Sequence, residues 1–129
     1  MIDIKPVVLQ ALESNQALVD LIGQDRDGLV RIYQRGTVPY ADEFPRITFF
    51  EYVNYDNEFA DDEEIGSLIA VQVDIWHMVS TTAIAKAVDK AMKAAGFRRT
   101  SAADLYEDDT KVFHKGLRYQ IQMILDKEG

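Results

Sequence analysis

Three long segments in which apolar and polar residues alternate constrain this chain most, because a period of two predicts half-buried β-strands. These segments cover residues 46–55, 67–79 and 111–125. A shorter candidate strand covers residues 30–34, and a weaker one lies around residues 105–107. We therefore expect a sheet of four to five strands, rich in antiparallel pairs, as the framework of the fold.

Two further segments repeat apolar residues at spacings of three and four, which indicates amphipathic helices. The first begins with Pro6, which suits a first helical position, and ends before Gly23. The second follows Ser80 or Thr81, either of which can cap a helix, and ends before Gly96. The chain is thus expected to be a single α+β domain over residues 1–129, with two helices on one face of the sheet.

One face of the predicted sheet is almost uniformly apolar. Its members are Ile47, Phe49, Val53, Val71, Val73, Ile75, Leu117, Tyr119, Ile121, Met123 and Leu125. Burying a side chain of this size contributes roughly 1.5–3 kcal/mol. We expect this face to lie under the helices and to supply most of the stability.

The opposite face mixes aromatic, charged and amide side chains. The candidates for an interaction site on it are Phe50, Tyr52, Asp74, Trp76, Met78 and Arg118. Aromatic residues, methionine and arginine together are typical of protein interfaces. Two interpretations stay open: the face binds another protein, or loops such as residues 36–43 cover it.

Acidic residues are concentrated in one segment, residues 54–64. It contains six carboxylates and no basic residue: Asp56, Glu58, Asp61, Asp62, Glu63 and Glu64. The whole chain has a net charge of −8, whereas the rest of it has 16 acidic and 14 basic residues. We expect a mobile acidic loop that faces a partner or a channel. The segment lacks the glycine that a calcium-binding EF-hand loop requires, so no metal site is assigned to it.

The composition excludes most catalytic chemistry. The chain has no cysteine, which removes disulfides, thiolate metal sites and cysteine nucleophiles. Its two histidines, His77 and His114, fall on different predicted strands, and we expect His77 to be a hydrogen-bonded structural residue and His114 to lie exposed or at a bulge. Its glycines do not form a phosphate-binding motif, and no apolar run reaches the ~20 residues of a membrane span. We expect a protein that is not an enzyme and has no cofactor.

Four short strings carry a resemblance to a known family. They are RIY at 31–33, VP at 38–39, FPRITF at 44–49 and VQVDIW at 71–76, the last followed by a Lys/Ala-rich helix. With this order of elements, the chain resembles the small tail-completion or head-to-tail joining proteins of long-tailed bacteriophages and prophages. The likeness covers nearly the whole chain.

The resemblance implies a structural protein without catalytic residues. Members of the family pack two helices on a sheet and assemble into a ring, usually of six subunits, that caps the tail tube and docks to the head connector. DNA passes through the ring without specific binding. The resemblance implies a location at the head-proximal end of the virion tail, assembly in the bacterial cytoplasm and no membrane partner.

A second function stays open on the sequence alone. A small acidic prophage inhibitor or adaptor would use residues 54–64 to bind a basic partner, because clustered carboxylates can mimic phosphates. The two functions differ in self-association, since a ring protein binds copies of itself and an inhibitor needs only its target.

Overall fold

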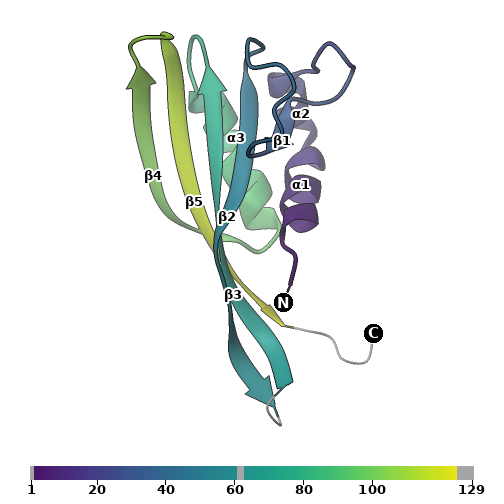
Figure 1. Cartoon of the computed structure of the whole chain (residues 1–129). Helices are drawn as coiled ribbons and strands as arrows, with labels where there is room; N and C mark the ends of the chain where they lie inside the picture. The colour runs from purple at the N-terminus through teal and green to yellow at the C-terminus, as the bar shows by residue number, and fades with distance from the viewer. Residues whose placement is uncertain (1, 61–62, 125–129) are drawn as a thin grey trace.

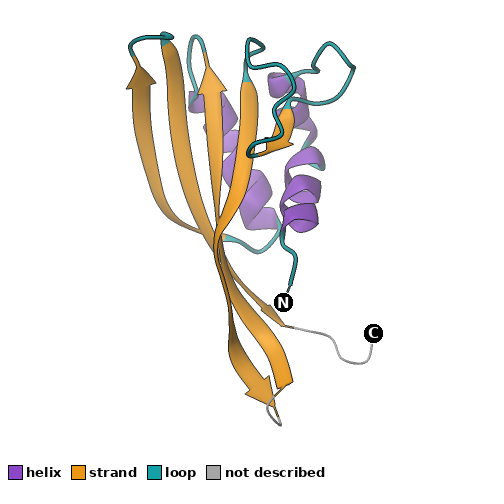
Figure 2. Cartoon of the chain, viewed as in Figure 1, coloured by secondary structure: helices purple, strands orange, loops and turns teal. Residues whose placement is uncertain are grey.

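The computed structural model describes residues 2–60 and 63–124, and shows a twisted sheet with helices on one face (Figures 1 and 2). The elements of this part of the chain are α1 (Lys5–Glu13), α2 (Gln16–Ile22), β1 (Ile32–Gln34), β2 (Arg46–Ala60), β3 (Glu63–His77), α3 (Thr82–Ala94), β4 (Arg98–Glu107) and β5 (Val112–Ile124). The predicted α+β class is confirmed.

The sheet has the strand order β1-β2-β3-β5-β4. β1 pairs with β2 in parallel, and the other three pairs are antiparallel. The edge strand β4 is much longer than the weak segment predicted around residues 105–107. Every residue of β4 is exposed, so its sequence lacks the alternation that marks a half-buried strand.

The first predicted helix is two helices in the structure. The side chain of Asn15 accepts a hydrogen bond from the backbone N–H of Leu18, at 3.0 Å, and caps the start of α2. Leu12 in α1 and Ile22 in α2 are both fully buried, so the helices on both sides of this break contribute to the core. The apolar spacing therefore continues across the break. The prediction of two helices is therefore wrong in number, whereas Pro6 does lie in the first turn of α1.

The core lies between the sheet and the helices, as the alternation predicts. Ile47, Val73, Ile75 and Tyr119 are completely buried, and Ile121 and Met123 pack against the core. Leu125 lies outside the described residues.

Val53 departs from the predicted face. A β-bulge between Glu51 and Val53 shifts the register, so Val53 pairs with Ala70, which alternates with core residues Ile69 and Val71. Val53 therefore belongs to the face opposite the helices and is not part of the core.

β2 and β3 continue as a hairpin beyond the layer of helices (Figure 1). We call its distal part, residues 54–68, the arm. Backbone pairing extends along the arm to Ala60 and Glu63, so the prediction of a loop over 54–64 is wrong for 54–60 and 63–64. β5 also pairs with β3 as far as Gly66, which adds a third strand at the base of the arm, whereas Glu63 and Glu64 pair with β2. Asp61 and Asp62 lie outside the described residues, and the mobility of the segment stays a prediction.

An amide pair crosses the arm above Gly66. Asn57 of β2 and Gln122 of β5 exchange two side-chain hydrogen bonds of 2.8 and 2.9 Å. Gly66 of β3 lies between these strands, and a Cβ atom there would be 3.0 Å from Gln122 Nε2. The missing side chain therefore leaves room for the contact.

We expect Val73→Asp to lower the free energy of unfolding by more than about 3 kcal/mol, because it puts an unpaired charge into the core. Ala103→Asp is the matched control, since Ala103 is exposed on β4. Urea unfolding of both variants measures the difference. Equal stability of the two variants would contradict the assignment of faces.

Candidate functional site

The sheet face opposite the helices, which we call the open face, brings together most of the predicted site. Paired residues across β2, β3 and β5 form rows there, and one row consists of Phe50, Gln72 and Arg118. Phe50, Tyr52, Asp74, Trp76 and Arg118 lie on this face, joined by the contacts described below. Met78 does not join them, because β3 ends at His77 and Met78 is exposed beyond it.

Asp74 is the centre of a hydrogen-bond network on the open face. The residue is only 5% exposed, and its Oδ1 accepts from Gln72 Nε2 at 2.8 Å and lies 2.7 Å from His114 Nε2. Gln72 Oε1 in turn accepts from Arg118 Nε at 3.0 Å. On the neighbouring strand, a Cβ atom at Gly116 would lie 3.2 Å from Asp74 Oδ1. The buried carboxylate is thus satisfied by polar partners, which a low-dielectric site requires.

Trp76 is held in the same network through its ring. The ring stacks on His114 with centroids 3.8 Å apart and an angle of 11°. Trp76 Nε1 donates to Thr48 Oγ1 at 3.2 Å. The tryptophan is therefore a fixed, partly buried part of the face.

The environment of one histidine agrees with its prediction, and that of the other does not. His77 is structural as predicted: its Nδ1 accepts from the backbone N–H of Val79 at 2.9 Å, and burial lowers its pKa. His114 was expected to be exposed or at a bulge, but it is partly buried against Asp74 and Trp76. The alternation of the last strand could have predicted the position of His114, because it sets His114 on the same face as Arg118.

Arginines cover the other aromatic rings of the open face. The guanidinium carbon of Arg118 is 4.8 Å from the ring centre of Tyr52, and that of Arg35 is 4.5 Å from the ring centre of Phe50. Such contacts are worth ~0.5–1 kcal/mol at exposed sites. Tyr52 remains 37% exposed, so this side of the face is open to a partner.

The loop between β1 and β2 covers the other side of the face. Gly36 and Val38 line a hollow together with Thr48 and Trp76. Arg46 Nη1 donates to the carbonyl of Ala41 at 2.9 Å and ties the loop to the sheet. The loop therefore covers one side of the face, and binding of another protein to the rest of the face stays a prediction.

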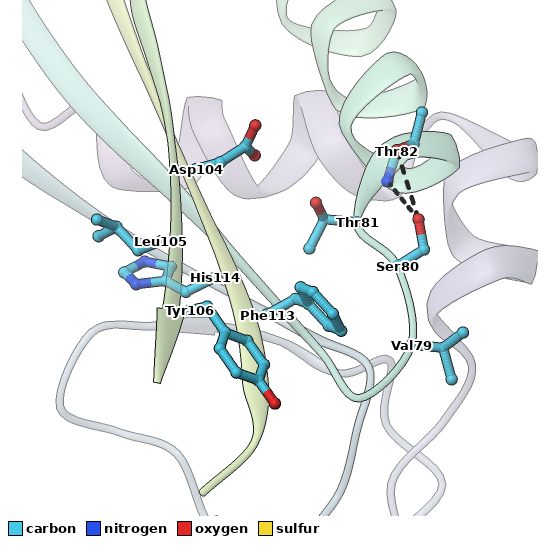
Figure 3. A pocket seen from close by; sticks show the side chains of 9 residues that line it. All are labelled: Val79, Ser80, Thr81, Thr82, Asp104, Leu105, Tyr106, Phe113 and His114. Carbon is cyan, nitrogen blue, oxygen red and sulfur yellow. Dashed lines mark hydrogen bonds between the residues drawn. The ribbon is translucent and has the colours of Figure 1, made fainter. Parts of the chain in front are cut away.

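A second hollow lies between the β4–β5 hairpin and the segment before α3 (Figure 3). Its apolar lining residues are exposed to solvent: Val79, Leu105, Tyr106 and Phe113. The rings of Tyr106 and Phe113 are 4.8 Å apart. Ser80 Oγ accepts from the N–H of Thr82 at 3.3 Å, whereas Thr81, which occupies the N-cap position of α3, makes no side-chain capping hydrogen bond. This patch was not predicted from the sequence, because exposed residues on an edge strand give no periodic signal.

Within residues 2–60 and 63–124, no group of three or more His, Asp or Glu side chains could hold a metal ion. No helix in that part of the chain is long and apolar enough to cross a membrane.

Comparisons with known proteins agree with one another. The family model described as "Tail completion protein gp17" matches residues 6–123. No curated protein sequence is significantly similar to the chain. Among solved structures, a chain of the "Virion of native gene transfer agent (GTA) particle" is similar, with a TM-score of 0.65 and 15% identity over 92% of each chain. At this identity the likeness shows the fold.

We expect Asp74→Ala to lower the free energy of unfolding by ~1–3 kcal/mol, because Gln72 and His114 lose a buried acceptor. Trp76 is the only tryptophan in the chain, so its fluorescence reports directly on this network. Asp104→Ala is the control: it removes an exposed ion pair with Lys115, worth at most ~1 kcal/mol, and leaves the emission unchanged. Unchanged emission in Asp74→Ala would contradict the role of the network.

Proposed function

This chain belongs to the tail completion protein gp17 family, and from that premise we propose that it is a structural protein that completes the tail of a phage or phage-like virion. Copies of the chain form a ring, of six subunits as the family resemblance implies. The ring caps the tail tube at its head-proximal end, after assembly in the bacterial cytoplasm, and docks to the head connector. It acts without catalysis, and DNA passes through it without specific binding.

The observation that carries this proposal is the extent of the family match. Residues 6–123 include α2, α3, all but the first residue of α1 and nearly all of the sheet, so the match spans almost the whole described fold. The ring itself is supported by the open face, whose exposed Tyr52 and Arg118 are residue types enriched in interfaces. Contacts between two different patches of one chain close into a ring when the rotation per subunit divides a full circle.

The concentration of acidic residues in positions 56–64 fits two roles. Carboxylates repel phosphates, so an acidic lining would let DNA slide through a ring. A basic surface on a neighbouring protein would instead attract them. Either role, a lining that repels DNA or a contact with a basic protein, agrees with this concentration of carboxylates.

We expect Tyr52→Ala to fold normally and to reduce the yield of complete particles, because Tyr52 is an exposed aromatic residue of the ring contact. The measurement is complementation of a particle-producing strain that lacks the gene, with particles counted by electron microscopy. Leu21→Ala is the control, since Leu21 is also exposed but belongs to α2 on the other side of the sheet. A wild-type yield with Tyr52→Ala would argue against this face as the ring contact.

We expect lysine at positions 61–64 in place of the four acids to leave the melting temperature unchanged or higher, because self-repulsion decreases. Particle assembly or DNA delivery decreases instead. If the protein is an inhibitor or adaptor, the same variant loses a soluble basic target while particles stay normal. A sharp loss of stability would contradict both functions, since it would mean that these acids are paired within the fold.

A further inference from the structure

The two edges of the sheet differ in whether their backbone groups find partners. At the β1 edge, the carbonyl of Gln34 accepts from the N–H of Thr37 at 3.0 Å and from Thr37 Oγ1 at 2.6 Å. The N–H of Ile32 donates to the carbonyl of Val30 at 2.7 Å. The three-residue edge β1 is thus closed by its own chain.

The other edge, β4, is open. It is ten residues long, every one of them is exposed, and it is the outermost strand of the sheet (Figure 1). Across residues 2–60 and 63–124, the backbone groups of residues 98–106 bond only to β5. An edge of this kind is a template for a further strand.

The middle of β4 lacks the features that commonly block such pairing. Natural edge strands are protected by bulges, prolines or lysines. The bulge of β4 lies near its start, between Arg99 and Ser101, and residues 101–107 contain neither proline nor lysine. The small residues Ala102 and Ala103 leave room for a second strand beside them.

The charges of β4 favour a second β4 strand as the partner. β4 begins with Arg98 and Arg99, whereas Glu107 ends it and Asp108 follows. In an antiparallel pair of two β4 strands centred on Ala103, Arg99 comes beside Glu107. Arg98 comes beside Asp108 in the same register. Opposite charges across two strands are favourable, whereas a parallel pair would put like charges side by side.

Two of these charged groups are free for such a contact. Arg98 donates to Gln120 at 3.1 Å, but neither Arg98 nor Asp108 has an ion-pair partner in the described part of the chain. The apolar side chains nearby are also uncovered, since Leu105 is 56% and Tyr106 is 48% exposed. A second strand along β4 therefore supplies opposite charges and covers apolar surface.

We propose that the free protein forms a two-fold dimer in which β4 of one copy pairs antiparallel with β4 of a second copy, centred on Ala103. The contact joins two five-stranded sheets into one continuous sheet. Both copies use the same strand, so the pair is closed and does not by itself extend into a ring. The dimer is separate from the proposed ring contact on the open face, and it protects an edge that would otherwise pair unspecifically.

Cysteine cross-linking tests the register, since the chain has no cysteine of its own. Two Ala103→Cys chains bring their cysteines opposite each other, where Cα atoms are about 4.5–5.5 Å apart and within reach of a disulfide. Leu105→Cys is the matched control on the same strand, because its two copies lie roughly 13 Å apart at 3.3 Å per residue.

Under mild oxidation we expect Ala103→Cys to form disulfide-linked dimers and Leu105→Cys to stay monomeric. A mixture of Leu105→Cys and Ser101→Cys should form the mixed dimer, because these positions lie opposite each other in the proposed register. Cross-linking of Ala103→Cys no faster than that of Leu105→Cys overturns the inference.

Charge exchange tests the dimer without a cross-link. Arg98→Glu and Asp108→Arg each put like charges beside one another at both ends of the pair, so we expect each to weaken dimerisation about tenfold or more. Mixed in equal amounts, the two variants restore opposite charges in a heterodimer. Lys90→Glu is the control, with the same charge change as Arg98→Glu at an exposed position of α3. Sedimentation velocity measures the dissociation constant of the dimer, and the melting temperature checks the fold.

We expect wild type and Lys90→Glu to dimerise equally, and the mixture of the two β4 variants to dimerise more strongly than either variant alone. A wild-type protein that stays monomeric up to about 1 mM overturns the inference. So does a mixture no more dimeric than its components, or a wild-type ring whose size Arg98→Glu leaves unchanged. None of these results affects the proposed function, which fails instead if a particle-producing strain that lacks the gene makes normal particles.

Discussion

The layer of aliphatic side chains between sheet and helices fixes every other feature of the molecule. Strand side chains alternate, so burying Val73 and Ile75 forces Gln72, Asp74 and Trp76 to the other face. A slip of one residue would bury Asp74 among apolar side chains and expose Val73. The composition of the open face is thus a consequence of core register, and its polar network forms on a backbone that is already specified.

Features that depend on one strand at a time could be predicted from the sequence. Alternation identified the faces of three strands, and Val53 was misassigned because a bulge adds one residue without a mark in the hydrophobic pattern. Asn15 interrupts a continuous apolar spacing by capping, which competes with helix continuation only locally. The segment 54–64 was predicted as a loop because its charge suggested solvation, whereas the structure pairs β2 with β3 as far as Ala60 and Glu63.

The residues of the candidate site could be predicted from single strands, but the contacts between them could not. Its aromatic and charged members could be identified on separate strands, but their contacts depend on the order β2-β3-β5. His114 and Asp74 are 40 residues apart in sequence, and only the adjacency of β3 and β5 brings them within 2.7 Å. Arg35 was not predicted as part of the site, because it follows a three-residue strand whose parallel pairing leaves no sequence signal.

The amide pair above Gly66 has a mechanical consequence. Asn57 and Gln122 connect the two outer strands across the middle one, so side chains as well as backbone join three strands at the base of the arm. β2 and β5 are not neighbours in the sheet, so this amide pair is a direct side-chain link between two strands that share no backbone pairing. Loss of either amide would therefore weaken the link between two strands and leave the backbone ladder of the sheet intact.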